Sequence, residues 1–212
     1  PLVRAAALLL TLTLASASEA QPAQTVLFPG MSGQPLLDAI RASYRPASTL
    51  GYDAARDAFM AWEQQYAGGL TCVYSGYAVT LTPGADPSTD AFNKGINTEH
   101  TWPQSMGTAA EPRRSDLHHL YATRDAVNSA RGNLPFGESP DAQTSTWYRL
   151  AATQTSIPSA SLAEWSERQG SVRFEPREDH KGNVARSMFY MRAVYPEMVT
   201  SSGAAAFFEG QR

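Results

Sequence analysis

The chain of 212 residues contains one cysteine, Cys72. A single thiol cannot form a disulfide within its own chain, so a packed apolar core must hold the folded state together. Hydrophobic residues make up 42 % of the chain and charged residues 17 %, which is typical of a folded globule. The length suits one substantial domain. Cys72 lies in the apolar run LTCVY, so we expect it to be a small buried side chain and not a nucleophile.

The first twenty residues have the layout of a secretory signal peptide. Arg4 precedes an apolar run over residues 5–15, and small residues follow up to Ala20. The alternative, a buried N-terminal helix, is the weaker interpretation. We therefore expect a signal peptide over 1–20, a flexible lead-in over 21–33 and a folded domain over 34–212, in a secreted or periplasmic protein. Since the chain begins with Pro1 and not Met, we also expect it to be a fragment.

Periodicity predicts a mixture of helices and strands. Tyr52, Ala55, Phe59 and Trp62 recur at helical spacing, so we expect these side chains to be core residues of a helix over 51–66. Alternation around Gly76 predicts a hairpin. We further expect helices over 36–44, 115–132 and 182–195, an extended segment over 93–100, and loops over 83–90, 107–114 and 135–161. The prediction is a single α+β domain.

The dipeptide Glu99-His100 is the first candidate for chemistry. A carboxylate is a hard oxygen ligand for magnesium or calcium, and a neutral imidazole can take a proton from water. In a regular strand, however, adjacent side chains point to opposite faces. Both residues can serve one site only if the backbone bends there, and Pro103 makes a bend nearby plausible.

The segment VNSARGN is the second candidate. Asn128 offers an amide oxygen, also a hard ligand, and Arg124 and Arg131 neighbour it if the helix continues across all three residues. A metal ligand flanked by guanidinium groups suits a phosphate. The alternative is an ordinary helix end, with the arginine stabilising the helix dipole. Spacing alone slightly favours this alternative.

Two function classes are disfavoured. No HExxH or CxxC spacing is present, so zinc bound by the adjacent pair His118-His119 is not expected. The net charge of −3 argues against attraction of nucleic acid by the protein as a whole. The residues alone therefore indicate a hard-metal site with a histidine and arginines, which suits phosphodiester hydrolysis without requiring it.

Four segments in order resemble the bacterial endonuclease I family, which belongs to the ββα-metal (His-Me finger) nucleases. They are NTEHTWPQS, SDLHHL, VNSARGN and FEPREDHKGNVARSMFYM, and the upstream GYDAARDAF and CVYSGY are also similar. The resemblance covers roughly residues 51–195 and implies a ββα-metal core packed among helices. Members of the family usually continue beyond the point where this chain ends, so the resemblance also implies a truncated C-terminus.

The resemblance assigns roles to individual residues. It implies that His100 is the general base, that Glu99 and Asn128 bind a single Mg²⁺ ion, with Ca²⁺ or Mn²⁺ as substitutes, and that Arg113 or Arg114 holds the phosphate. Nucleic-acid backbone contacts are further expected of Arg124, Arg131, Lys181 and Arg186.

The implied activity is that of a secreted, sequence-tolerant endonuclease acting on DNA, and on RNA as a further substrate. Hydrolysis with one metal ion and a histidine base would leave a 5′-phosphate. No membrane segment and no obligate protein partner are expected. Two alternatives stay open: a catalytically inactive DNA-binding protein on a nuclease fold, and a metal phosphodiesterase acting on small substrates.

Overall fold

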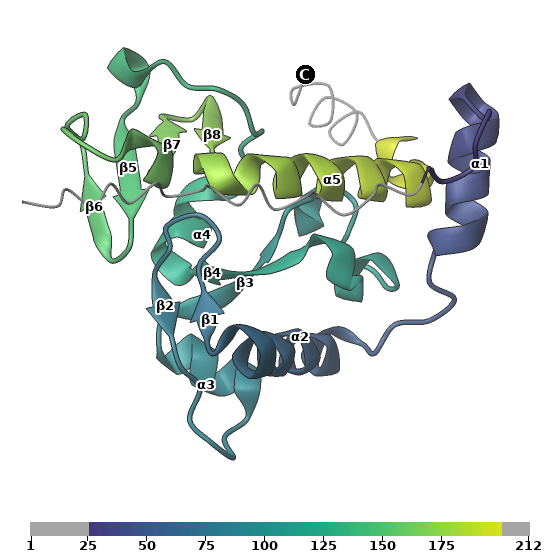
Figure 1. Cartoon of the computed structure of the whole chain (residues 1–212), viewed down its shortest axis with the longest axis horizontal. Coiled ribbons are helices and arrows are strands. Elements are labelled where there is room, and N and C mark those ends of the chain that lie inside the picture. The colour runs from purple at the N-terminus through teal and green to yellow at the C-terminus, as the bar shows by residue number, and fades with distance from the viewer. Residues whose placement is uncertain (1–25, 201–212) are drawn as a thin grey trace, which may run out of the picture. The chain divides into compact units, whose positions relative to one another are not determined.

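The computed structural model describes residues 26–200 (Figure 1). The expected signal peptide lies outside the described residues, and the proposed domain boundaries stay predictions. Of the described residues, 26–31 belong to a separate unit, and the fold described below is that of the compact unit from Ser32 onward.

The first two helices follow the apolar periodicity of the sequence. They are α1 (Gly33–Tyr44) and α2 (Tyr52–Ala67). In α2, Ala55 and Phe59 are buried as expected. Trp62 is not a core residue, because 60 % of its surface is exposed. The apolar stripe therefore predicts the helix correctly but overestimates how far the core extends along it.

A short hairpin follows α2, with β1 (Leu70–Thr71) antiparallel to β2 (Ala78–Val79). Gly76 turns the chain at φ 74°, where a side chain would be strained, and Cys72 is fully buried as expected. The expected loop over 83–90 is partly wrong, because helix α3 (Pro87–Asn93) begins there. Asp86 caps α3 by accepting a hydrogen bond from the Thr89 N–H, and a proline follows the cap.

The centre of the fold is a β-hairpin with a helix packed on it. Strand β3 (Ile96–His100) pairs antiparallel with β4 (Leu120–Arg124), and α4 (Asp125–Arg131) packs on both. The expected helix over 115–132 is therefore wrong in its first half, which contains a 3₁₀ turn and β4. Only its end is helical, and Gly132 at φ 53° terminates it as expected.

The C-terminal half contains structure that the sequence did not indicate. The stretch expected as loop forms β5 (Thr146–Arg149) and β6 (Ala152–Gln154), which join β7 (Ser166–Gln169) and β8 (Arg173–Glu175) in an antiparallel sheet of order β6-β5-β7-β8. Helix α5 (Glu178–Val194) confirms the last expected helix and buries Val184, Met188 and Met191. Short 3₁₀ turns complete the chain: η1 (Gln104–Met106), η2 (Arg113–Ser115), η3 (Leu117–His119), η4 (Asp141–Gln143), η5 (Leu162–Glu164) and η6 (Pro196–Thr200).

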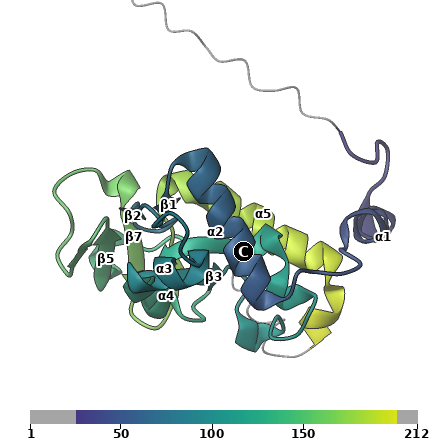
Figure 2. The same ribbon diagram turned by 90° about the horizontal axis from the view of Figure 1, so that it is seen from below.

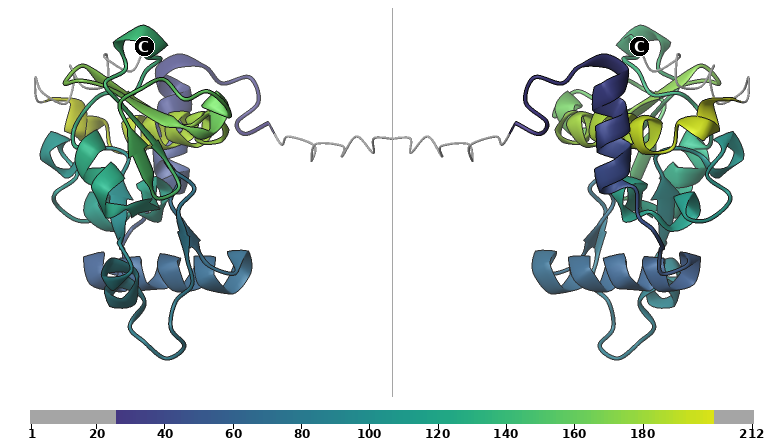
Figure 3. Two further views of the ribbon diagram at one scale, coloured as in Figure 1. Left: turned by 90° about the vertical axis from the view of Figure 1, so that its left-hand side faces the viewer. Right: turned by 90° about the vertical axis from the view of Figure 1, so that its right-hand side faces the viewer.

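The β3–β4 hairpin lies between two long helices. Leu120 and Tyr121 of β4 line a groove with α2 residues, and the Tyr121 hydroxyl also lies 2.9 Å from the Ser187 hydroxyl of α5. Helices α2 and α5 lie on opposite sides of the hairpin (Figures 1 and 3), and α3 lies beside α2 (Figure 2). This is a single α+β domain, as predicted. Within residues 26–200, no helix is both long and apolar enough to cross a membrane.

One buried carboxyl gives a pH-dependent prediction. Glu167 of β7 faces Glu175 across the sheet, is only 6 % exposed, and accepts a 2.6 Å hydrogen bond from the Thr144 hydroxyl. Burial, helped by the charge of Glu175, raises the pKa of Glu167 to about 7. The native state therefore loses stability as pH rises from the ordinary glutamate pKa through about 7.

We expect Glu167→Gln to increase the free energy of unfolding at pH 8 by about 2 kcal/mol and to have little effect near pH 4. Denaturant unfolding at both pH values measures this difference. Glu164→Gln is the control, because Glu164 is exposed and its ion pair with Arg149 is a surface pair that contributes little to stability. Equal effects of Glu167→Gln at the two pH values would contradict the explanation.

Candidate active site

Glu99 and His100 occupy the last two positions of β3 and are 2 % and 6 % exposed. Their side chains contact different neighbours, as alternation in a strand requires. Glu99 contacts Tyr74 and Arg131, whereas the His100 ring lies 5.4 Å from the Tyr52 ring. Nevertheless both residues line one cavity of about 430 Å³, together with Asn128 of α4. The expected backbone bend is absent, because β3 pairs with β4 in unbroken register up to His100, and the two residues reach one cavity from a regular strand.

The Glu99 carboxylate is held by two donors on the same oxygen. The Tyr74 hydroxyl donates to Oε1 over 2.8 Å, and the Arg131 guanidinium lies 2.9 Å from it. Burial raises the pKa of Glu99 above its ordinary value, while the charge of Arg131 and the bond from Tyr74 oppose that rise. The side chain is thus a buried, oriented carboxylate with a fixed counter-charge.

The hydrogen bonds of His100 define its tautomer. Nε2 lies 3.0 Å from the Arg114 carbonyl oxygen, which can only accept, so Nε2 carries the proton. Nδ1 lies 3.4 Å from the side-chain nitrogen of Gln104, which can only donate. Burial, followed by the nearby His119, lowers the pKa of His100 to about 3. The imidazole is therefore neutral at pH 7, with its lone pair on Nδ1, the nitrogen that faces Gln104.

Asn128 presents an oxygen to the cavity because its nitrogen is engaged elsewhere. Nδ2 donates to the Thr98 carbonyl over 3.0 Å, which assigns Oδ1 as the remaining acceptor. A carboxylate and an amide oxygen around one cavity are the donors that a hard divalent cation prefers. The residues present therefore fit the ion that the sequence indicated.

The two candidate arginines of the loop point to different surroundings. Arg114 stacks on Tyr52, a cavity residue, with its guanidinium carbon 4.1 Å from the ring centroid. Arg113 instead lies 3.6 Å from the Glu197 carboxylate. The structure therefore distinguishes the two candidates, which the sequence could not do: Arg114 lies beside the cavity and Arg113 beside Glu197.

Comparison with known proteins decides the family. The family model described as "Endonuclease I" matches residues 41–212. The chain belongs to the endonuclease I family. Two relatives are named extracellular ribonuclease, from Bacillus amyloliquefaciens and from Bacillus subtilis (strain 168), with 34 % and 33 % identity. Each alignment covers 106 residues, 47 % of this chain but 29 % of the relative, so the match spans less than a third of their length. The family and the relatives support a nuclease.

The four further arginine and lysine residues considered for this endonuclease I domain are placed differently from one another. Arg131 is 1 % exposed and donates to the carbonyls of His100 and Thr101. Arg124 is half-buried beside Tyr77. Arg186 is exposed and donates to Asn183. Backbone contacts by these residues stay predictions, and the hydrogen bonds of Arg131 also make it a support of the site.

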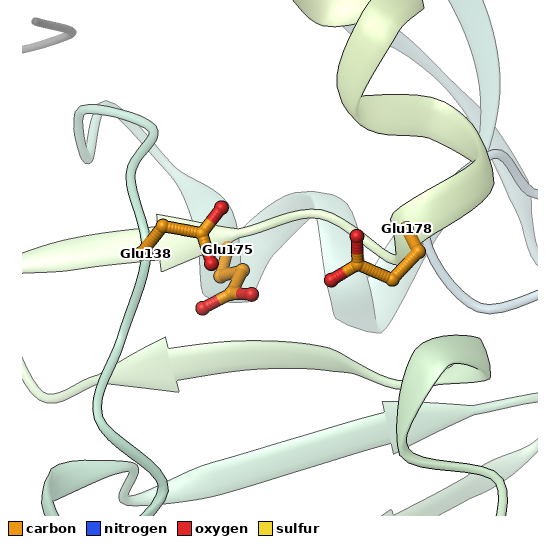
Figure 4. A group of neighbouring side chains, drawn as sticks. All are labelled: Glu138, Glu175 and Glu178. Atoms are coloured by element: carbon orange, nitrogen blue, oxygen red, sulfur yellow. The ribbon is translucent and has the colours of Figure 1, made fainter.

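Lys181 lies in an acidic cluster that the sequence did not reveal. Figure 4 shows the three glutamates of this cluster. In the described part of the chain, Glu138, Glu175 and Glu178 form the one group of three metal-ligating side chains close enough to share an ion. The Lys181 ammonium, however, lies 2.6–2.8 Å from all three carboxylates. Burial lowers the pKa of Lys181, but these hydrogen bonds outweigh it and raise the pKa above its ordinary value. The lysine already supplies the positive charge here, so a metal ion would have to displace it.

Three site residues were missed by reasoning from the sequence. Tyr52 is expected in the core, Tyr74 lies in the apolar run LTCVY and in the similar segment CVYSGY, and Gln104 has no expected role. Each acts through a contact with a segment distant in the chain or through a turn, so spacing gave no signal. Only the family resemblance of CVYSGY and NTEHTWPQS marked the segments of Tyr74 and Gln104.

Proposed function

We propose that this chain is a secreted endonuclease that hydrolyses phosphodiester bonds of DNA, and also of RNA, with little sequence preference. One observation carries the proposal. The neutral His100, with a lone pair on Nδ1, lines the same cavity as the oxygen ligands Glu99 and Asn128. A base and a hard-metal donor set at one site match the needs of phosphodiester hydrolysis.

Glu99 and Asn128 would hold the cation, with Mg²⁺ the expected ion and Ca²⁺ or Mn²⁺ as substitutes. When bound, such an ion stabilises the negative charge that develops on the phosphate and the leaving oxygen. The amide of Asn128 adds a ligand without adding a second negative charge opposite the phosphate. Arg131 already offsets the charge of Glu99.

The proton transfer is assigned to His100. Nδ1 would accept a proton from the attacking water, and the Nε2–H bond to the Arg114 carbonyl would hold the ring in place during the transfer. Attack in line with the 3′ oxygen then leaves a 5′-phosphate. Arg114, beside the cavity on Tyr52, is placed to bind the phosphate whose charge increases in the transition state.

Binding through phosphates explains how an acidic protein can act on a polyanion. Two cationic groups lie near the cavity: the guanidinium carbons of Arg114 and Arg56 are 4.1 Å and 4.8 Å from the ring centroid of Tyr52, which lines the cavity. Phosphate contacts carry no base information and weaken with added salt. Secretion is supported by the layout of residues 1–20.

A plasmid-nicking assay tests the proposal. We expect the chain to convert supercoiled DNA to nicked and linear forms with Mg²⁺, a chelator to reduce cleavage to background, and excess Mg²⁺ to restore it. DNA ligase should reseal the nicks, because it requires a 5′-phosphate. A parallel assay on single-stranded RNA measures activity on the substrate named in the two relatives.

Three results would contradict the proposal in different ways. Cleavage that persists in chelator would exclude the metal ion. Binding of DNA without cleavage would favour an inactive nuclease fold. Hydrolysis of a small phosphodiester such as bis(p-nitrophenyl) phosphate, with intact plasmid and intact RNA, would favour a small-molecule phosphodiesterase.

A further inference from the structure

The guanidinium of Arg131 is bound to three consecutive residues at the end of β3. Nη1 lies 2.9 Å from Glu99 Oε1 and donates to the His100 carbonyl over 3.1 Å, and Nη2 donates to the Thr101 carbonyl over 2.7 Å. The side chain is 1 % exposed, and its guanidinium carbon lies 4.3 Å from the centroid of the Phe136 ring. Arginine suits this position, because its planar fork offers several donors in fixed directions.

The same helix supplies a second tie to the strand. Asn128, one turn before Arg131 on α4, donates to the Thr98 carbonyl. Helix α4 is therefore fastened to β3 at residues 98, 99, 100 and 101. These contacts fix the separation of Glu99 and Asn128, because one of the two residues is on the helix and the other is on the strand.

Tyr74 completes the arrangement from a third segment. It is fully buried, and its hydroxyl donates to Oε1, the same oxygen that Arg131 contacts. Two donors on one oxygen prevent the carboxylate from rotating and determine where Oε2 points. The guanidinium alone would neutralise the charge of Glu99. The additional hydrogen bond from Tyr74 to the same oxygen therefore serves to orient the carboxylate.

We infer that Arg131 and Tyr74 are positioning residues that hold Glu99 in the orientation in which it and Asn128 bind one divalent cation. This inference rests on the proposed function, since it assigns the ion to that site. The simpler alternative is that both side chains only stabilise the fold. A second alternative is that Arg131 competes with the cation for Glu99. The three ideas predict different metal affinities.

Mn²⁺ binding to the substrate-free protein distinguishes them, measured by the electron paramagnetic resonance signal of free Mn²⁺. Loss of an outer ligand-orienting contact costs about 10–100-fold in metal affinity. We expect Arg131→Lys, which keeps the charge but not the fork, to weaken Mn²⁺ binding by about that factor. Tyr74→Phe, which changes no charge, should weaken it by about 10-fold, the lower end of that range.

Two control variants match these changes at other carboxylates. Arg149→Lys alters an arginine paired with Glu164, and Tyr195→Phe removes a buried hydroxyl that donates to Asp116 over 2.7 Å. Neither residue lines the cavity, so neither should change Mn²⁺ affinity. Thermal unfolding of all four variants reports stability separately. If Arg131→Lys does not fold, Tyr74→Phe decides the question.

Unchanged Mn²⁺ affinity in folded Arg131→Lys and Tyr74→Phe would overturn the inference and leave both residues a structural role. Tighter binding in Arg131→Lys would also overturn it, in favour of competition. Wild-type protein that neither binds Mn²⁺ nor cleaves DNA would overturn the proposed function, and this inference with it.

Discussion

Replacement of His100 by alanine should reduce the rate of DNA cleavage by a factor of about 10²–10⁴, the usual contribution of a general base. The neutral imidazole lines the cavity with its proton on Nε2 and its lone pair on Nδ1, and it is the base in the proposed mechanism. Alanine removes the acceptor but leaves the cation ligands and the loop arginines. DNA binding should therefore stay measurable by fluorescence anisotropy, whereas the single-turnover rate of DNA cleavage should fall by the factor given above.

His118→Ala is the matched control for this experiment. His118 is an exposed histidine of the same endonuclease I domain, stacked on Tyr190 and bonded to Asp116, and it does not line the cavity. We expect its loss to leave the cleavage rate within a few-fold of wild type. Full activity of His100→Ala, or an equal loss in both variants, would reject His100 as the base.

The spacing of apolar residues correctly predicts helices, because a helix is formed by residues that are close together in the sequence. Helices α2 and α5 carry long apolar stripes, and the structure confirms both. The helix expected over 115–132 shows the limit of this reasoning. Leu117, Leu120 and Val127 fit a helical stripe, yet β4 forms because five residues pair with β3. The partner strand lies twenty residues earlier in the chain, so the segment LYATR alone contains no information about the pairing.

The site shows the same division. The chemistry of Glu99, His100 and Asn128 was visible in their side chains, but spacing did not place them together and the family resemblance did. What the sequence could not supply is the set of contacts between distant segments. Tyr74 reaches Glu99 across twenty-five positions, and Arg131 reaches the end of β3 across thirty. Such contacts form only once distant segments pack together, and the spacing of apolar residues along the chain does not predict them.

Separate replacement of the two loop arginines should give unequal losses. Arg114→Ala should slow cleavage by about 10²–10³-fold, the range for one charge-stabilising donor in an active site. Arg114 stacks on the cavity residue Tyr52 and is placed to bind the phosphate. Arg113→Ala should change the rate by less than about threefold, because that guanidinium is paired with Glu197 near the surface. Single-turnover rates at fixed salt measure both.

The two alanine variants can be compared directly, because each keeps the backbone carbonyl through which that arginine contacts a histidine. The Arg114 carbonyl accepts from His100 Nε2, and the Arg113 carbonyl accepts from His119 Nε2 over 2.8 Å. Alanine keeps both carbonyls, so the two imidazoles stay in place and only the guanidinium is lost. A larger loss in Arg113→Ala than in Arg114→Ala would mean that the loop turns on binding substrate and presents the other arginine. Equal, small losses would mean that neither guanidinium binds the phosphate. The loop would then serve only to orient His100 through the Arg114 carbonyl.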